Sequence, residues 1–189
     1  MVSKPLSDQP PRAQEASRSA DTGPGERLYH MRIDRNGVWH HEGRPILRTP
    51  LVKLFASVLR REVDGDHWLV TPVERGRIEV EDAPFVIVEL TVDGSGREQI
   101  VHMRTNLDEW VTVGSDHPLG MRLPKDRSQD GPENGPADVP LPYVDVRQGL
   151  EGRLTRATYY QLVELGDSHH LDGALRYGVW STGRFFPLD

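Results

Sequence analysis

The sequence predicts an α+β fold with two halves, each made mostly of antiparallel strands with one main helix. The densest apolar patterning lies at residues 68–90, where strand-like segments follow one another closely. An amphipathic helix is predicted on each side of this stretch, at 49–61 and at 155–165. The other apolar segments are short and end at Gly, Asn, Asp or Pro, which is typical of strands joined by turns. We therefore expect the stretch 68–90 to pack the two halves together.

The central stretch contains segments with different periods. Residues 68–70 form a short apolar run, 77–81 alternate with one charged face, and 85–90 are almost entirely apolar. These patterns predict a buried strand, a half-buried strand and a strand covered on both faces. Between the first two, Thr71, Pro72 and Glu74 have the spacing of a capping box and predict a single helical turn.

The first predicted helix opens with Thr49 as its cap and Pro50 in its first turn. Its apolar positions recur at helical spacing and predict one inner stripe, namely Leu51, Leu54, Phe55, Val58 and Leu59. In the second predicted helix Thr155 is the cap and Gly166 the stop signal. Its inner face is predicted to carry Tyr159, Leu162 and Val163.

Further strands are predicted at 29–33, 38–41, 99–103, 110–113, 119–123, 143–146, 175–181 and 184–188. Asn36-Gly37 and Thr182-Gly183 supply tight hairpin turns, and 167–173 is predicted to be a loop. The word Gly-Val-Trp occurs at 37–39 and again at 178–180, as an internal repeat would produce.

Composition divides the chain into a tail and two domains. Residues 1–27 are polar and proline-rich and predict a disordered tail. An N-terminal α+β domain is expected at 28–82 and a C-terminal domain at 83–189. Within the C-terminal domain, 124–142 is a proline-rich, acidic loop.

Charge and residue usage exclude several classes of protein. The net charge is -6 and the pI about 5.7, which opposes binding to nucleic acid and to anionic membranes. There is no cysteine, which excludes disulfides, zinc ribbons and cysteine nucleophiles. No apolar run has the length of a membrane span, and the N-terminus lacks the apolar core of a signal peptide. The expected location is the cytoplasm.

Neither a catalytic site nor a metal or cofactor site is predicted. No serine lies in a Gly-x-Ser-x-Gly word, and Gly94-Ser95-Gly96 lacks the spacing of a dinucleotide loop. The pairs His40-His41 and His169-His170 cannot each supply two ligands to one ion, because neighbouring residues on a strand point to opposite faces.

Several polar residues instead fit a small anionic ligand. Carboxylates at a strand break before Pro84 can be aimed into a cleft, helix N-termini offer free amides to an anion, and arginine binds phosphate through two hydrogen bonds. An aromatic ring near a helix start can meet a base. The candidate ligand-binding residues are Thr71, Glu74, Glu81, Asp82, Arg104, Asn106, Arg153, Arg156 and Tyr159. Thr71 and Glu74 also fit a simple helix cap, and the arginines also fit solvated surface charge.

Several words of the sequence resemble the bacterial family called domain of unknown function 1285. They are GVWHHEGRPILR (37–48), LVTPVERGRIEVEDAPF (69–85), RTN (104–106), DHPL (116–119), PYVDVRQGLEGRLTRATYYQL (142–162) and GVWSTGRFFPL (178–188). The resemblance implies a duplicated α+β arrangement whose C-terminal half is superficially like a pleckstrin-homology fold. It also implies a nucleotide-like ligand at the domain interface and a role in signal transduction. The segment before Tyr29 and the loop at 124–142 depart from this pattern.

We therefore expect a non-catalytic binding module for a nucleotide-like or other small anionic ligand, with an unknown protein partner. One alternative is an enzyme acting on a phosphorylated ligand, with Glu81 or Asp82 as its base. Another is a protein-interaction module that uses the pleckstrin-like half.

Overall fold

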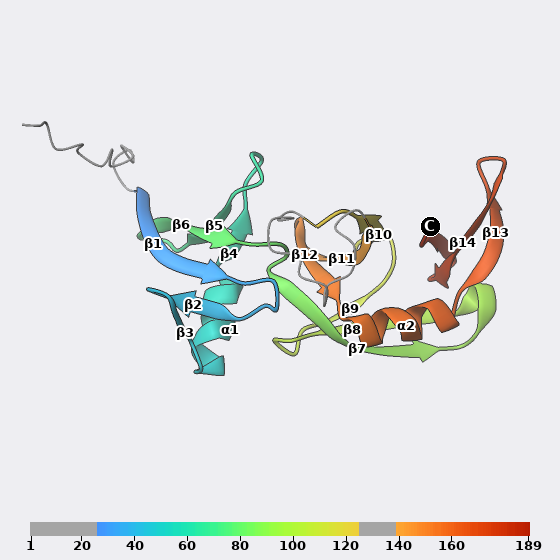
Figure 1. Ribbon diagram of the computed structural model, residues 1–189, viewed down its shortest axis with the longest axis horizontal. Coiled ribbons are helices and arrows are strands. Elements are labelled where there is room, and N and C mark those ends of the chain that lie inside the picture. Colours follow the sequence, from blue (N-terminus) through green and yellow to red (C-terminus); the bar gives the residue numbers. More distant parts are fainter. Residues whose placement is uncertain (1–25, 125–138) are drawn as a thin grey trace, which may run out of the picture.

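The computed structural model describes residues 26–124 and 139–189. Figure 1 shows the N-terminal half at one end of the long axis and the C-terminal half at the other. The predicted disordered tail, apart from its last residues, and most of the predicted proline-rich loop lie outside the described residues. No described helix is long and apolar enough to cross a membrane.

The N-terminal half is a six-stranded sheet in the order β3-β2-β1-β6-β5-β4. Its first and last strands, β1 and β6, pair in parallel, and every other pairing is antiparallel. The elements are β1 (Glu26–Ile33), β2 (Trp39–His41), β3 (Arg44–Pro45), α1 (Thr49–Ser57), β4 (Leu59–Arg61), β5 (His67–Val70) and β6 (Arg75–Val80).

The C-terminal half contains a second six-stranded sheet, ordered β10-β11-β12-β7-β8-β9, and then a three-stranded sheet, β13-β14-β15. The elements of the larger sheet are β7 (Phe85–Asp93), the short 3-10 helix η1 (Gly96–Glu98), β8 (Ile100–Thr105), β9 (Trp110–Thr112), β10 (Leu119–Arg122), β11 (Leu141–Arg147) and β12 (Leu150–Leu154). They are followed by α2 (Arg156–Glu164), β13 (Asp167–Leu171), β14 (Ala174–Ser181) and β15 (Arg184–Pro187). β7 begins near the centre of the molecule and runs beside α2 (Figure 1).

The two large sheets have the same topology. In each, two three-stranded antiparallel units meet through a parallel pair, β1 with β6 and β7 with β12. The predicted α+β fold with two related halves is therefore confirmed, while the likeness to a pleckstrin-homology fold stays a prediction. The repeated word Gly-Val-Trp does not mark this repeat, because 37–39 leads into β2 whereas 178–180 lies inside β14.

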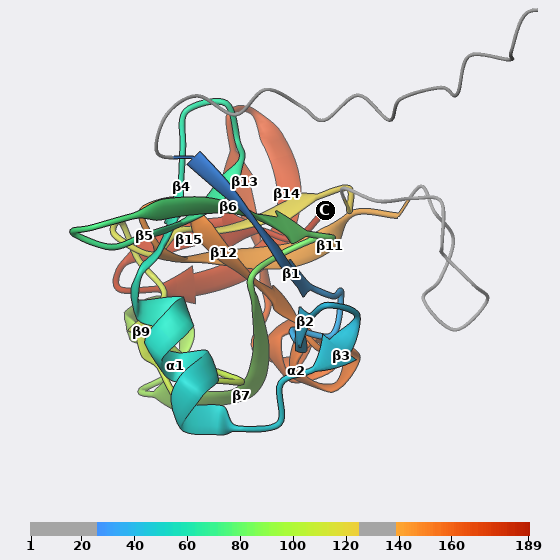
Figure 2. The same ribbon diagram turned by 90° about the vertical axis from the view of Figure 1, so that its left-hand side faces the viewer.

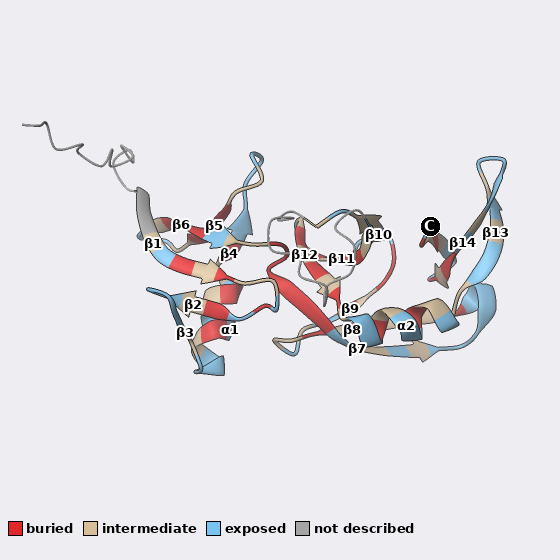
Figure 3. Ribbon diagram, viewed as in Figure 1, coloured by how far each residue is buried: buried red, intermediate tan, exposed pale blue. Residues whose placement is uncertain are grey.

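The core is continuous across both halves. Its largest fully buried side chains include Trp39 of the first sheet and Phe85, Ile87 and Met103 of the second. Figure 3 shows buried residues concentrated at the start of β7. The segment 85–90 is covered less than predicted, because Phe85, Val86 and Ile87 are buried but Val88 is exposed.

The predicted inner stripe of the first helix is wrong in part. Val52 and Ala56 are the buried helical positions, while Leu54 is exposed and Phe55 half-buried. The helix carries apolar residues on two faces, and the sheet covers only one of them. The N-cap is Arg48 rather than Thr49, and its side chain makes no capping hydrogen bond.

Two local predictions are corrected by backbone pairing. Thr71 and Glu74 lie in the turn between β5 and β6 and not in a helix, because the Thr71 amide donates to the Glu74 carbonyl at 2.9 Å and closes a hairpin. The predicted loop at 167–173 contains β13, because 167–171 pairs with β14 without a break. The Thr155 cap of α2 is confirmed, since its hydroxyl accepts from the Thr158 amide at 3.2 Å.

Helix α1 is held by side chains of the other half. Arg147 Nη2 donates to the Ala56 carbonyl at 2.6 Å, and its Nη1 lies 2.6 Å from Glu109. Lys53 pairs with Asp108 at 2.7 Å. Because the last carbonyls of a helix lack partners within it, the Arg147 guanidinium completes α1 from across the boundary.

Candidate functional site

The linker between the sheets, residues 81–84, carries two consecutive carboxylates with different partners. Glu81 accepts from the Arg32 guanidinium and from the Arg35 amide, the latter at 3.0 Å. Its own amide donates to the Ile33 carbonyl at 3.0 Å. Glu81 thus fastens the linker to β1 and to the turn that follows it.

Asp82 faces the C-terminal half and is only 4% exposed. The Tyr143 hydroxyl lies 2.9 Å from each carboxylate oxygen. Arg122 Nη1 is 3.3 Å from Oδ1, and Arg153 Nε is 3.5 Å from Oδ2. Because a buried charge is tolerated only when it is paired and hydrogen-bonded, these partners explain how Asp82 is accommodated.

Arg122 connects Asp82 to Glu151, and Arg153 connects it to the β1–β2 turn. The Arg122 guanidinium lies 3.5 Å from the centroid of the Tyr143 ring, and its Nη2 is 2.9 Å from Glu151. Arg153 Nη2 donates to the Arg35 carbonyl at 2.7 Å, in the β1–β2 turn. We name these five residues, Asp82, Arg122, Tyr143, Glu151 and Arg153, the junction cluster.

Burial and charge set the protonation of the cluster. Burial, and then the neighbouring Asp82 carboxylate, raise the pKa of Tyr143 well above its usual range. Burial alone would lower the pKa of Arg122, but the hydrogen bond to Glu151 and the neighbouring charges leave that pKa raised. Tyr143 is therefore a neutral donor, and Arg122 is a fixed cation.

A cavity of about 270 Å³ opens beside the junction cluster. It is lined by β10 and by strands β11 and β12, and it contains Pro118, Leu119, Gly120, Met121, Arg122, Tyr143, Asp145 and Glu151. Asp145 is held in place because both its oxygens accept from the Gly149 amide, at 3.1 and 3.2 Å. The volume is slightly below the roughly 300–1,000 Å³ of typical ligand sites, which suits a small molecule.

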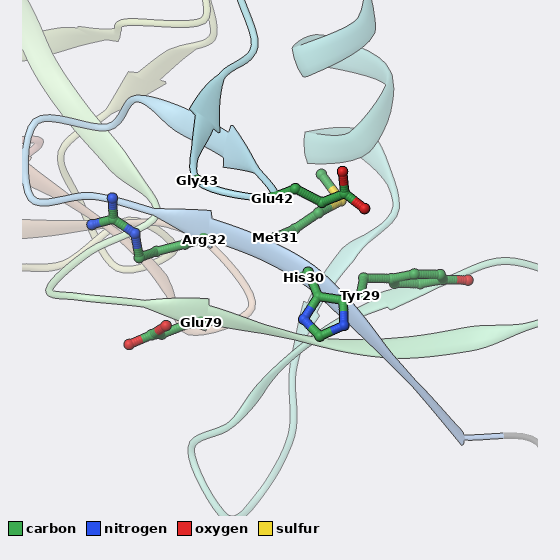
Figure 4. Close-up of a pocket in the computed structure, with 7 residues that line it drawn as sticks. All are labelled: Tyr29, His30, Met31, Arg32, Glu42, Gly43 and Glu79. Carbon is green, nitrogen blue, oxygen red and sulfur yellow. The ribbon is translucent and has the colours of Figure 1, made fainter.

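A second cavity, of about 510 Å³, lies on the sheet of the N-terminal half (Figure 4). β1 contributes Tyr29, His30, Met31 and Arg32, and Glu42, Gly43 and Glu79 complete its lining. Arg32 lines this cavity and also binds Glu81, as Arg122 lines the smaller cavity and binds Asp82. The linker therefore touches one cavity-lining arginine in each half. A third, open cavity of about 660 Å³ shares Glu79 and continues towards Asp64 and Asp66.

The structure brings Glu81, Asp82 and Arg153 together at the junction. Asn106 also lies between the halves, but its side chain serves the backbone: it accepts from the Val86 amide at 3.1 Å and donates to the Gly37 carbonyl at 3.2 Å. A Cβ on Gly37, whose φ is +74°, would lie 2.7 Å from the Asn106 amide nitrogen, so the turn needs glycine.

The remaining predicted residues lie away from the junction cluster. Arg104 is engaged by Glu89 and Asp108, at 2.6 and 2.7 Å. Arg156 donates to the Tyr160 hydroxyl at 3.0 Å, and the Tyr159 ring stacks on that of Tyr160 with centroids 6.4 Å apart. Thr71 and Glu74 close the β5–β6 turn.

Sequence reasoning missed Arg122, Tyr143 and Glu151. Each lies on a strand whose local pattern indicates only alternation, and none is near Asp82 in the sequence. The described residues contain no group of three or more His, Cys, Asp or Glu side chains arranged to hold a metal ion.

Family models and solved structures agree on what this chain is similar to. The model described as "Domain of unknown function (DUF1285), N-terminal domain" matches residues 24–83, and that described as "Protein of unknown function (DUF1285), C-terminal domain" matches residues 84–188. A DUF1285 family protein from Silicibacter pomeroyi DSS-3 is 40% identical, with a TM-score of 0.72 over 86% of this chain and 80% of its own. One from Shewanella baltica OS155 is 28% identical, with a TM-score of 0.52 over 72% of this chain and 92% of its own. No curated protein matches the chain.

Proposed function

The chain belongs to the DUF1285 family, whose function is unknown, and we propose that it is a non-catalytic module that binds a small, nucleotide-like ligand at the junction of its halves. The observation that carries the proposal is the position of Arg122. It lines an open cavity and is at the same time anchored on the buried Asp82 of the linker.

The lining of the smaller cavity suits a ligand with both acceptor and donor groups. Arg122 can bind a phosphate or carboxylate through its planar fork of N–H groups. Glu151 and Asp145 offer oxygens to hydroxyl or amino groups of the same ligand. Phosphate next to hydroxyls is the pattern of a nucleotide. An anion arriving here shares Arg122 with Glu151, so binding involves exchange of an ion-pair partner and not only filling of a space.

A role in signal transduction would follow from the connections of Asp82. Arg122 and Arg153 share this carboxylate, and Arg153 also holds the backbone of the β1–β2 turn. A ligand that draws the Arg122 guanidinium towards the cavity changes how the Asp82 carboxylate is divided between Arg122 and Arg153. It thereby alters the contact of Arg153 with the β1–β2 turn of the N-terminal half. Couplings of this kind are typically worth about 1–3 kcal/mol.

The geometry gives less support to an enzyme that uses Asp82 as its base. Both carboxylate oxygens accept from Tyr143, two arginines flank them, and the side chain is almost fully buried. A substrate proton could not reach it without displacing these donors. Tyr143 cannot replace it, because its raised pKa keeps the phenol protonated.

The proposal is tested by calorimetry and thermal shift with adenosine and guanosine monophosphates, cyclic mononucleotides and inorganic phosphate. We expect one nucleotide to raise the melting temperature of the wild type, and Arg122→Gln to weaken its binding about tenfold or more. Arg184→Gln is the matched control, because Arg184 is an exposed arginine away from the junction.

Equal binding by the wild type and Arg122→Gln would refute the site, and turnover of the nucleotide would refute the non-catalytic reading. Since Arg122→Gln can itself lower stability, the quantity compared is the ligand-induced shift within each variant. Mass spectrometry of small molecules bound to the purified native protein gives an independent check of ligand class.

A further inference from the structure

Helix α1 has an apolar face that no described element covers. Leu51 and Leu54 are three residues apart on α1 and lie on one side of the helix, and Leu47 lies in the segment just before the N-cap residue Arg48. Leu47 is 87% exposed and Leu54 is 60% exposed, while Leu51 is half-buried. The opposite face holds the buried Val52 and Ala56. Figure 3 colours the N-terminal end of α1 as exposed, and Figure 2 shows this helix at the outer side of the N-terminal half.

The segment that contains these leucines is basic in a protein whose net charge is -6. Residues 44–54 include Arg44, Arg48 and Lys53 and contain no aspartate or glutamate. Lys53 is neutralised by Asp108 of the other half. Arg44 and Arg48 are exposed, and the described residues supply no hydrogen-bond or ion-pair partner to their side chains.

The N-terminus of α1 lacks the groups that normally complete one. Its N-cap residue, Arg48, makes no side-chain capping hydrogen bond, and its first turn contains no acidic residue. Pro50 has no amide hydrogen, and the amides of Leu51 and Val52 donate to the Arg48 carbonyl at 3.0 and 3.2 Å. The positive end of the helix dipole is therefore what a carboxylate from outside would stabilise. Arg48 is the N-cap residue of this end, Arg44 lies four residues before it, and both side chains are exposed.

We infer that the surface formed by α1 and the segment leading into it, made of Arg44, Leu47, Arg48, Leu51 and Leu54, docks an acidic amphipathic helix of a protein partner. The partner's apolar residues at i, i+3, i+4 and i+7 cover the leucines, which is the usual way in which a helix is recognised on an apolar surface. Its carboxylates pair with Arg44 and Arg48 near the positive end of the helix dipole. The surface lies in the N-terminal half, and its occupant is independent of the ligand proposed for the junction.

A membrane is a poorer match for this face. Helices that lie on anionic membranes combine a large apolar face with many Lys or Arg residues on the polar face, whereas α1 has nine residues and its polar face includes Lys53, already paired with Asp108. A second copy is also a poorer match, because a two-fold contact through this surface would bring the exposed arginines of both copies together.

The test uses the full-length protein and a synthetic helical peptide of about 16 residues, with leucines at i, i+3, i+4, i+7 spacing and glutamates between them. By fluorescence anisotropy we expect binding in the micromolar range that weakens as salt is raised. The double variant Leu47→Ser/Leu54→Ser and the double variant Arg44→Glu/Arg48→Glu should each weaken binding about tenfold or more. A peptide with lysine in place of glutamate should not bind.

The matched control is Val63→Ser/Val73→Ser, which removes two exposed apolar side chains from loops elsewhere in the same half and should leave binding unchanged. All six substituted sites are exposed, so the variants are expected to fold like the wild type, which circular dichroism would verify. Peptide binding that is absent, or equal in all variants, overturns the inference. So does binding to vesicles with about 30% phosphatidylserine without peptide binding, and so does a dimer in sedimentation that Leu47→Ser/Leu54→Ser dissociates.

Discussion

The two large sheets share one strand order but secure their helices in different ways. In the N-terminal half, α1 connects the two three-stranded units along the chain, after β3 and before β4. Its C-terminal end is completed by Arg147 of the other half. In the C-terminal half, α2 follows the last strand, is capped by its own Thr155, and is attached to β7 because the Thr155 amide donates to the Ile87 carbonyl at 3.1 Å. The three-stranded sheet β13-β14-β15 then adds to that half.

From this difference we expect the C-terminal half to be self-contained and the N-terminal half to depend on it. The first sheet covers only one face of α1, and residues of the second half hold that helix in place. A duplicated topology therefore does not imply equal stability, because stability follows from what covers each sheet and not from strand order.

The largest expected effect is on the core of the weaker half. Trp39 is fully buried, and Trp39→Ala should lower the free energy of unfolding by about 3–5 kcal/mol. If the C-terminal half is self-contained, hydrogen exchange should show that amides of β1, β2 and β6 lose protection while those of β8 and β11 keep it.

Phe85→Ala is the comparison for the other half. Phe85 is equally buried, at the start of β7, and its ring lies 5.2 Å from the Arg147 guanidinium that holds α1. Its loss should reduce protection in both halves. Uniform loss of protection in Trp39→Ala would contradict the asymmetry.

Phe55→Ala should lower the free energy of unfolding by less than these two substitutions, by about 1–2 kcal/mol, because Phe55 is only half-buried against Trp39.

The next effect concerns the carboxylate shared by the halves. Asp82→Asn keeps the shape of the side chain but leaves Arg122 and Arg153 without their shared anion, so we expect a loss of about 3 kcal/mol in urea denaturation. Tyr143→Phe removes a single donor and should cost about 1–2 kcal/mol. A cost below about 1 kcal/mol for Asp82→Asn would mean that solvent or other groups replace the carboxylate.

A smaller effect is expected where α1 meets the second half. Arg147→Met should cost about 2 kcal/mol, because both the carbonyl of Ala56 and the carboxylate of Glu109 lose a charged donor. Arg61→Met is the control: Arg61 also crosses the boundary, to the Gly149 carbonyl at 3.0 Å, but it is exposed and should cost less than about 1 kcal/mol. Equal costs would show that burial of the contact is unimportant.

The sequence predicted elements whose own residues carry the signal. Thr155 and Gly166 mark the ends of α2, and the break before Pro84 singled out Glu81 and Asp82. Arg153, one partner of Asp82, was among the predicted candidates. The partners Arg122 and Tyr143 were not predictable, because they lie on strands brought to Asp82 only by the pairing of β12 with β7. The inner face of α1 was misassigned because both faces are apolar and distant residues decide which one is covered. β13 was missed because its polar sequence becomes a strand only through pairing with β14.

The smallest expected effect is a pH dependence at the boundary. Lys53, and then Arg104, lower the pKa of Asp108 below its usual range. A carboxyl group with a lowered folded-state pKa contributes stability that is complete above its unfolded pKa and is lost as pH falls through the folded value. Between about pH 5 and pH 2 the wild type should therefore lose melting temperature more steeply than Asp108→Asn. Parallel curves would show that the Lys53 contact contributes nothing in solution.

The shared carboxylate has a consequence for dividing the chain. A cut between residues 83 and 84, where the two family models meet, leaves Asp82 on the first fragment and Arg122, Tyr143 and Arg153 on the second. Each fragment then carries one of two surfaces with complementary charge, together with the apolar residues beside that surface. We therefore expect that the chain can be split where the two family models meet, into two complementary pieces that recover the full fold by recombining, which would suit it to a fragment-complementation reporter.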